Sequence, residues 1–87
     1  MILYSRKALL DLNIKDLLSY CKDFGNIDRL EIIFEALHDL KLVKKELKII
    51  INKNHINKKY KKQLKNQLKT IENKINKLEN NFKITIL

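Results

Sequence analysis

The chain contains no proline, no tryptophan, one glycine and one cysteine among its 87 residues. Because proline and glycine mark most tight turns, their scarcity argues against a fold with many strands and turns. A single cysteine, Cys21, excludes an intramolecular disulfide and a zinc site built from the cysteines of one chain. We therefore predict one small domain over residues 1–87, with Cys21 as a small buried apolar residue.

Long uncharged apolar segments are also missing, and a membrane-spanning helix needs roughly 20 such residues. Arg6, Lys7 and Asp11 fall where a signal peptide would carry its apolar segment. These two absences predict an intracellular, cytoplasmic protein without membrane attachment.

The motifs of the common enzyme classes are absent as well. The chain has no glycine-rich phosphate loop and no Cys, His and Asp grouping suited to nucleophilic attack. Glu35 and His38 have the Glu-x-x-His spacing of di-metal helical bundles, but one copy supplies too few ligands. We expect a protein that is not an enzyme and holds neither metal nor cofactor.

Helical periodicity is what the sequence does contain. Residues 14–21 repeat apolar positions with a 3.6-residue period after Asn13, a good N-cap, and a less regular turn begins at Ser5. Gly25 is predicted to end this first helix in the left-handed conformation. Asp28 and Glu31 have the spacing of a capping box, flanked by a hydrophobic staple, so a long helix is predicted to begin at Asp28.

Two long helices are predicted, at about 28–52 and 57–81. The second carries a narrow seam of apolar residues spaced 4-3-4-3, as in a coiled coil. This seam comprises Leu64, Leu68, Ile71, Ile75 and Leu78. It is predicted either to pack on the first long helix within one chain or to form an oligomer. An antiparallel self-pair would bring Lys58 near Glu79 and Lys65 near Glu72 of the partner.

The predicted fold class is all-α: a small helical bundle built on a long antiparallel hairpin, with a shorter N-terminal helix. The chain ends, Met1–Tyr4 and Phe82–Leu87, are apolar and partly β-branched. They are predicted to be short extended segments that pair as strands or pack against the helices.

Positive charge is concentrated in the second half of the chain. The 19 Lys and Arg against 10 Asp and Glu give a net charge of +9, of which +8 belongs to residues 53–87. Lysines crowd the N-terminal end of the last helix, where the helix dipole disfavours cations. In the alternative interpretation, the abundance of lysine reflects the composition of an AT-rich genome, and the lysines only keep the protein soluble.

An antiparallel hairpin would bring two lysine stripes together near its connecting loop, and such a patch suits a phosphate backbone. The predicted nucleic-acid-binding residues are Lys41, Lys44, Lys45, Lys48, Lys53, Lys58, Lys59, Tyr60, Lys61, Lys62, Lys65 and Lys69. Tyr60 is included because its ring could stack on an unpaired base.

The sequence thus predicts a non-catalytic basic protein that binds nucleic acid, RNA in preference to DNA, or a nucleoprotein complex. A phage or mobile-element protein that inhibits a host nucleic-acid enzyme, such as a CRISPR effector, fits this description. The alternative function is a homo-oligomeric coiled-coil module for structure or protein interaction, with the seam as its interface and a homodimer as its simplest form.

Overall fold

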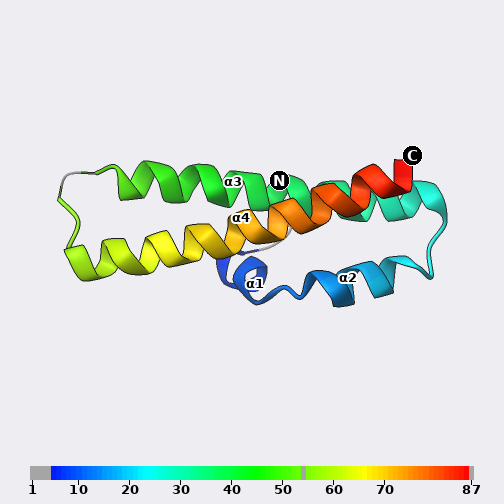
Figure 1. The fold of residues 1–87 in the computed structure, drawn as a ribbon, viewed down its shortest axis with the longest axis horizontal. Coiled ribbons are helices and arrows are strands. Elements are labelled where there is room, and N and C mark those ends of the chain that lie inside the picture. Colours follow the sequence, from blue (N-terminus) through cyan, green and yellow to red (C-terminus); the bar gives the residue numbers. More distant parts are fainter. Residues whose placement is uncertain (1–4, 54, 87) are drawn as a thin grey trace.

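Four α-helices form an elongated bundle in the computed structural model, with principal extents of 47 × 23 × 19 Å (Figure 1). The structure describes residues 5–53 and 55–86, excluding the side chains of residue 26 and of residues 81–86. The helices are α1 (Arg6–Asp11), α2 (Ile14–Cys21), α3 (Asn26–Ile51) and α4 (Lys58–Ile86). The predicted all-α fold, a long helical hairpin with a shorter N-terminal helix, is confirmed, with two short helices where one was predicted, and the described residues contain no strand.

Side-chain caps start both short helices. The Ser5 hydroxyl accepts a hydrogen bond from the Ala8 amide at 3.1 Å and so begins α1. The Asn13 side chain accepts from the Asp16 amide at 3.2 Å and begins α2, as its position in the sequence predicted. These caps satisfy amides that have no partner within the first turn of a helix.

The predicted start of α3 is wrong by two residues. Gly25 is the N-cap, with extended backbone angles (φ −62°, ψ 163°), and no side-chain cap bond forms there. Its carbonyl accepts the first helical bond from the Arg29 amide at 2.9 Å. Asp28 therefore lies inside the first turn and forms no capping box, and Ile27, part of the expected staple, is 75% exposed.

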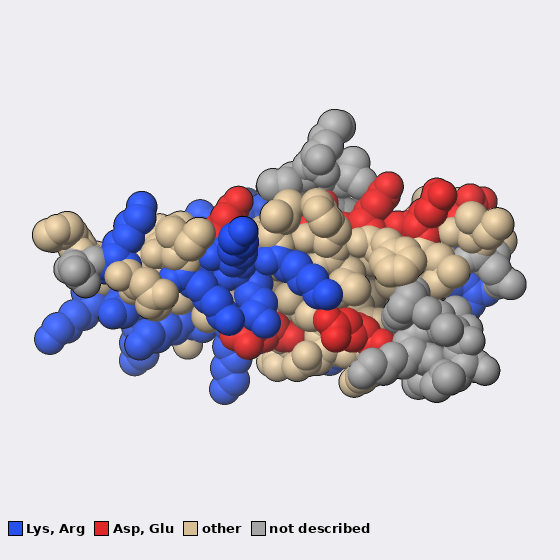
Figure 2. Space-filling model, turned by 90° about the horizontal axis from the view of Figure 1, so that it is seen from above, with Lys and Arg blue, Asp and Glu red and all other residues tan. Residues whose placement is uncertain are grey.

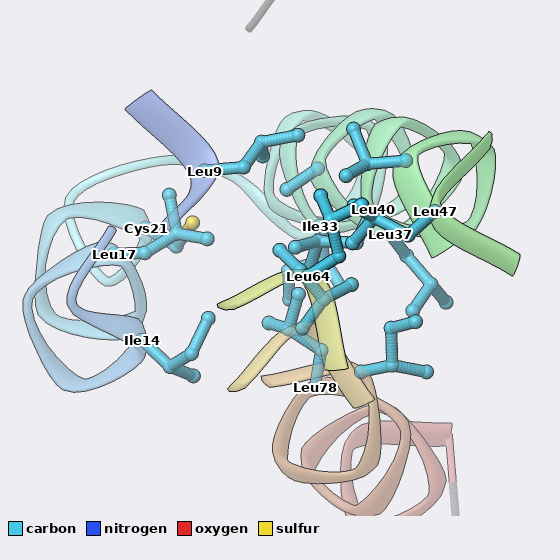
Figure 3. Close-up of a cluster of buried hydrophobic side chains, with 14 of the residues drawn as sticks. Leu9, Ile14, Leu17, Cys21, Ile33, Leu37, Leu40, Leu47, Leu64 and Leu78 are labelled. Atoms are coloured by element: carbon cyan, nitrogen blue, oxygen red, sulfur yellow. The ribbon is translucent and has the colours of Figure 1, made fainter. Parts of the chain in front are cut away.

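α3 and α4 pack antiparallel along most of their length (Figure 1). The core side of α3 consists of Ile33, Ala36, Leu37, Leu40, Val43, Leu47 and Ile51, all buried. Opposite them α4 buries Leu64, Ile71, Ile75 and Leu78 (Figure 3). Burying each such Leu or Ile side chain contributes about 1.5–3 kcal/mol to folding. This interdigitation makes the hairpin the rigid body of the protein.

α1 and α2 pack on one side of the hairpin, beside the half that is farther from the α3–α4 connection (Figures 1 and 3). They contribute Leu9, Ile14, Leu17 and Cys21 to the core, with Leu9 and Cys21 fully buried. The half nearer the connection therefore consists of two helices alone, and its surfaces are formed by α3 and α4.

The C-terminal segment does not adopt the extended conformation that its β-branched residues suggested. α4 continues as a helix through Ile86, and the prediction for residues 1–4 lies outside the described residues. Each residue added to an existing helix gains one hydrogen bond without a new nucleation step. A helix of 29 residues can thus extend through residues that prefer strands.

Candidate nucleic-acid interface

Two ion pairs define one face of the α3–α4 hairpin. The Lys41 Nζ lies 3.4 Å from Glu79 Oε1, and the Lys44 Nζ lies 3.9 Å from Glu72 Oε2. Because all four side chains meet across the helix boundary, these flanks of α3 and α4 border each other. The pairs are partly exposed, so each contributes only about 0.2–1 kcal/mol.

The predicted lysine stripes continue these same flanks towards the connection. On α3, Lys45 and Lys48 lie four residues after Lys41 and Lys44 and thus one turn further along. On α4, Lys69 and Lys65 lie three and seven residues before Glu72, again on its side of the helix. We call this surface the basic face: Lys41, Lys44, Lys45, Lys48, Lys58, Lys61, Lys62, Lys65 and Lys69.

Most of the basic face is open to solvent. Lys45 and Lys48 of α3 and Lys58, Lys62, Lys65 and Lys69 of α4 are exposed, and Lys61 is half-buried. Within the part of the chain that the structure describes, none of these seven lysines forms an ion pair. Their charges are therefore available to an external anion.

The fold concentrates the positive charge of the sequence at one end of the hairpin. Residues 41–70, the half of the hairpin around the connection, contain eleven lysines and one acidic residue, Glu46, a net charge of +10. Figure 2 shows Lys and Arg side chains crowded over this end and Asp and Glu side chains over the middle and the other end. The lysines of both stripes thus lie in the half of the hairpin near the connection, except that Lys41 and Lys44 lie where the acidic residues begin.

The remaining predicted residues lie off the basic face. Lys53 follows the C-cap of α3, and Lys59 is exposed on the outer side of α4. Tyr60 lies one turn before the buried Leu64, in line with the core, and remains 47% exposed because no short helix covers this end. The side chain of Asn57 accepts a bond from the Lys59 amide at 2.8 Å, so a neutral residue caps the end of α4 that is richest in lysines.

Lys74 has a structural role that the sequence did not reveal. Its Nζ donates to the Leu9 carbonyl at 2.9 Å and also to the Leu10 carbonyl, so it binds the C-terminal end of α1. Burial, the largest cause, lowers the pKa of this ammonium below its ordinary value, while Asp11 raises it and Lys77 lowers it further. This contact fastens α1 to the flank of α4 that faces away from the basic face.

The coiled-coil seam is used within one chain. Four of its five residues are buried in the hairpin core, and Leu68 is partly buried against it. Glu72 and Glu79, which an antiparallel self-pair would bring near Lys65 and Lys58 of a second copy, pair with Lys44 and Lys41 of α3. The structure thus adopts the intramolecular alternative, and an oligomer through this seam would first have to open the hairpin.

The acidic and histidine residues do not assemble a metal site within the described part of the chain. Asp39 is buried, and its Oδ1 lies 3.3 Å from Nδ1 of the mostly exposed His38. Its burial follows from its position three residues after Ala36 and four before Val43, two residues of the core.

Cys21 is fully buried, as predicted. Burial raises the pKa of its thiol, and the positive charge of Arg29 acts in the opposite direction. The thiolate is therefore disfavoured in the folded chain, as expected of an unreactive cysteine.

Comparison of the chain with protein-family models, curated proteins and solved structures finds no match. Among the residues that the structure describes, no helix is both long and apolar enough to cross a lipid bilayer. The functional argument therefore rests on the geometry and charge of the basic face.

Proposed function

We propose that this protein is a non-catalytic nucleic-acid-binding protein whose basic face engages the phosphate backbone. The observation that carries the proposal is that two lysine stripes on consecutive helices continue the ion-paired flanks of α3 and α4 and are mostly open to solvent. Nine lysines share this face, and the seven outside the two ion pairs meet no acidic side chain among the described residues. Phosphate backbones are the biological polyanions that such an array of point charges suits best.

The distribution of the lysines favours a ligand over a mere effect on solubility. Solubility needs net charge, which lysines spread around the bundle would supply with less mutual repulsion. Here the charges are crowded, and several stand in the first turns of α4, whose dipole opposes them. The first turn of α4 contains no acidic residue to offset this arrangement. An anionic partner would compensate for both costs.

The residue types favour binding without base readout. Bidentate recognition of base edges relies chiefly on arginine, and both arginines, Arg6 and Arg29, lie outside the basic face. Lysine ammonium groups instead attract phosphates of any sequence. A protein of this kind would inhibit a nucleic-acid enzyme by occupying its substrate rather than by mimicking it.

The test compares two triple variants with the same change in net charge. Lys45, Lys62 and Lys65 are replaced by Gln in the first, and Lys7, Lys15 and Lys22, exposed lysines of α1, α2 and the end of α2, in the second. Affinity for a fluorescein-labelled oligonucleotide is measured by anisotropy between about 50 and 200 mM salt. Far-UV circular dichroism verifies that both variants keep the wild-type helical content.

In the basic-face variant, the plot of log K against log salt is expected to become less steep. The absolute value of its slope should fall by about three, one for each phosphate contact removed. The control variant should keep the wild-type slope. Equal losses in both variants would mean that only net charge matters and would refute a defined interface. An affinity that does not respond to salt would refute the proposal altogether.

A further inference from the structure

Exposed apolar side chains gather at the two ends of the bundle. Tyr20, Ile27 and Phe34 lie in the half away from the α3–α4 connection, and Ile49 and Tyr60 lie beside the connection. Among the described side chains, none of comparable size is exposed between these two groups. Single exposed apolar residues are ordinary, whereas groups of them mark surfaces that contact a partner.

One face of α3 combines two of these residues with acidic ones. Ile27 and Phe34 are 75% and 49% exposed, and Asp28, Glu31 and Glu35 are exposed beside them. At about 100° per residue, the five positions fall within an arc of about 120° on the side of α3 opposite its buried residues. We call this surface the acidic face. It extends about 12 Å along one helix, so the common orientation of its residues follows from helical geometry alone.

The cations of this half of the bundle lie off the acidic face. Arg29, the cation that precedes Lys41 on α3, is half-buried, and its charge acts on the thiol of Cys21 in the core. Lys74 binds α1, and Lys77 borders a groove that it shares with residues of α2. Figure 2, seen from above Figure 1 and thus from the α3 side, shows Asp and Glu side chains along this end. The acidic face therefore presents one sign of charge.

The other half of the same protein has the complementary chemistry. Residues 41–70 carry a net charge of +10, and Ile49 and Tyr60 are 54% and 47% exposed among their lysines. Each surface thus offers apolar groups surrounded by charge of one sign, and the two signs are opposite. Because α3 is one continuous helix, the acidic face cannot fold onto the basic half of its own chain. The complementary surface has to come from another molecule.

We propose that the acidic face docks on the basic half of a second copy of this chain, head to tail. The two surfaces differ, so the contact is heterologous, and each docked copy leaves one surface of each kind open to further copies. The net charge of +9 does not prevent this contact. The Debye length is about 8 Å at physiological salt, so charges separated by much of the 47 Å bundle hardly repel, whereas charges in contact attract.

This contact would regulate the proposed function. The acidic face occupies lysines that the proposed function assigns to phosphates, so nucleic acid and a second copy compete for the basic half. That competition rests on the proposed function, whereas the contact between copies does not.

The first experiment measures self-association by sedimentation equilibrium. An interface on one short helical face is weak, so the weight-average mass should exceed the monomer mass by about 1.5-fold or more only near 0.5 mM protein in 0.1 M salt. It should fall towards the monomer mass at about 0.5 M salt, because salt screens the charges that meet. A monomer at all these concentrations, or an association that ignores salt, would overturn the proposal.

Matched variants test the acidic face. Glu31→Gln with Glu35→Gln should weaken association by about twofold to thirtyfold, the range for two exposed ion pairs. Asp11→Asn with Asp16→Asn changes the net charge equally on α1 and α2, where both side chains are exposed, and should leave association unchanged. Equal losses in the two variants would mean that net charge alone governs association and would refute the docking surface.

A third variant tests the apolar part of the contact. Ile27→Ser should weaken association by about threefold or more, because it removes apolar area that the partner covers. The side chain is 75% exposed, so circular dichroism should show the helical content of the wild type. Unchanged association would overturn the contact.

Backbone amide chemical shifts of the ¹⁵N-labelled wild type, followed on dilution, locate the two surfaces. Head-to-tail docking is expected to move signals both in residues 27–35 and in residues 41–70. Changes confined to one of these segments would refute it, since a contact of the acidic face with itself, or of the basic half with itself, would involve one segment alone.

A short oligonucleotide in excess should then dissociate the copies. An oligonucleotide that binds but leaves association unchanged would overturn the inference that nucleic acid and a second copy share the basic half. Failure of the oligonucleotide to bind would instead refute the proposed function, and self-association would stand on its own measurements.

Discussion

Replacing Lys74 with methionine should detach α1 from the hairpin. The substitution keeps an unbranched side chain of similar length but removes the ammonium that donates to the carbonyls of Leu9 and Leu10. Hydrogen bonds to a charged group contribute about 1.5–3 kcal/mol, and the Leu9 carbonyl keeps a weaker bond from the Leu12 amide at 3.3 Å. Two such bonds exceed the cost of burying the ammonium, which its lowered pKa reflects, so we expect a net loss of about 2 kcal/mol in the free energy of unfolding.

That loss is large for a chain of this size. A domain of 87 residues has a stability of about 4–13 kcal/mol, and in this size range 1 kcal/mol shifts the Tm by about 4–8 °C. Lys74→Met should thus lower the Tm by about 8–16 °C in thermal unfolding followed by circular dichroism. Lys69→Met, an exposed change on the same helix, is the control and should shift it by less than about 2 °C. Equal Tm values for the two variants would refute the anchoring role.

The pH dependence of the free energy of unfolding tests the burial of Lys74 separately. Because burial lowers the pKa of Lys74 in the folded chain, the unfolded chain retains this proton at higher pH than the folded chain does. The contribution of this group to the free energy of unfolding therefore rises as pH passes through the lowered pKa towards the ordinary value of 10.5. The stability difference between wild type and Lys74→Met should grow between pH 8 and that value. A difference that shrinks would contradict the assigned burial.

Three further variants and one labelling experiment test other parts of the structure. Gly25→Asp should raise the Tm by about 4–8 °C, because the carboxylate can cap α3, the added Cβ meets nothing within 4 Å, and a side chain restricts the unfolded chain. Ile75→Asp should unfold the monomer, measured as loss of helical circular dichroism, and a folded monomer would argue against the hairpin core. Cys21 should react with a thiol reagent only as fast as the bundle opens, and urea should accelerate labelling by orders of magnitude. Glu72→Gln combined with Glu79→Gln should tighten nucleic-acid binding, because it extends the positive surface. The loss of the two ion pairs should lower the free energy of unfolding by about 1–2 kcal/mol or less. An unchanged affinity would mean that the ligand binds elsewhere.

The fold was largely predictable because its signals are local and repeated. Asn13 caps α2 where the sequence indicated, and the apolar period of residues 28–52 and 57–81 predicted the hairpin. The start of α3 was mispredicted because Gly25 and Asp28 both suit an N-cap, and one turn of sequence does not decide between them. The end of α4 was mispredicted because the helical context outweighed the preference of its β-branched residues.

The candidate site was predictable only in part. Lysine spacing placed each stripe on its own helix, whereas their meeting on one face depends on the rotation of α3 against α4. The roles of Lys44 and Lys74 likewise depend on what faces them: Glu72 for the first and the end of α1 for the second. Neither partner lies near its lysine in sequence, so no local pattern could have identified the contacts.

The sequence by itself determined the helical class, the hairpin, the buried cysteine and the excess of charge in residues 53–87. These properties follow from apolar periodicity and composition, which act over a few residues at a time. Only the tertiary structure decided that the seam is used within one chain and that Lys41 and Lys44 pair with Glu79 and Glu72 across the boundary of α3 and α4. Such properties depend on how α3 and α4 are rotated against each other, which the size and shape of the whole core set.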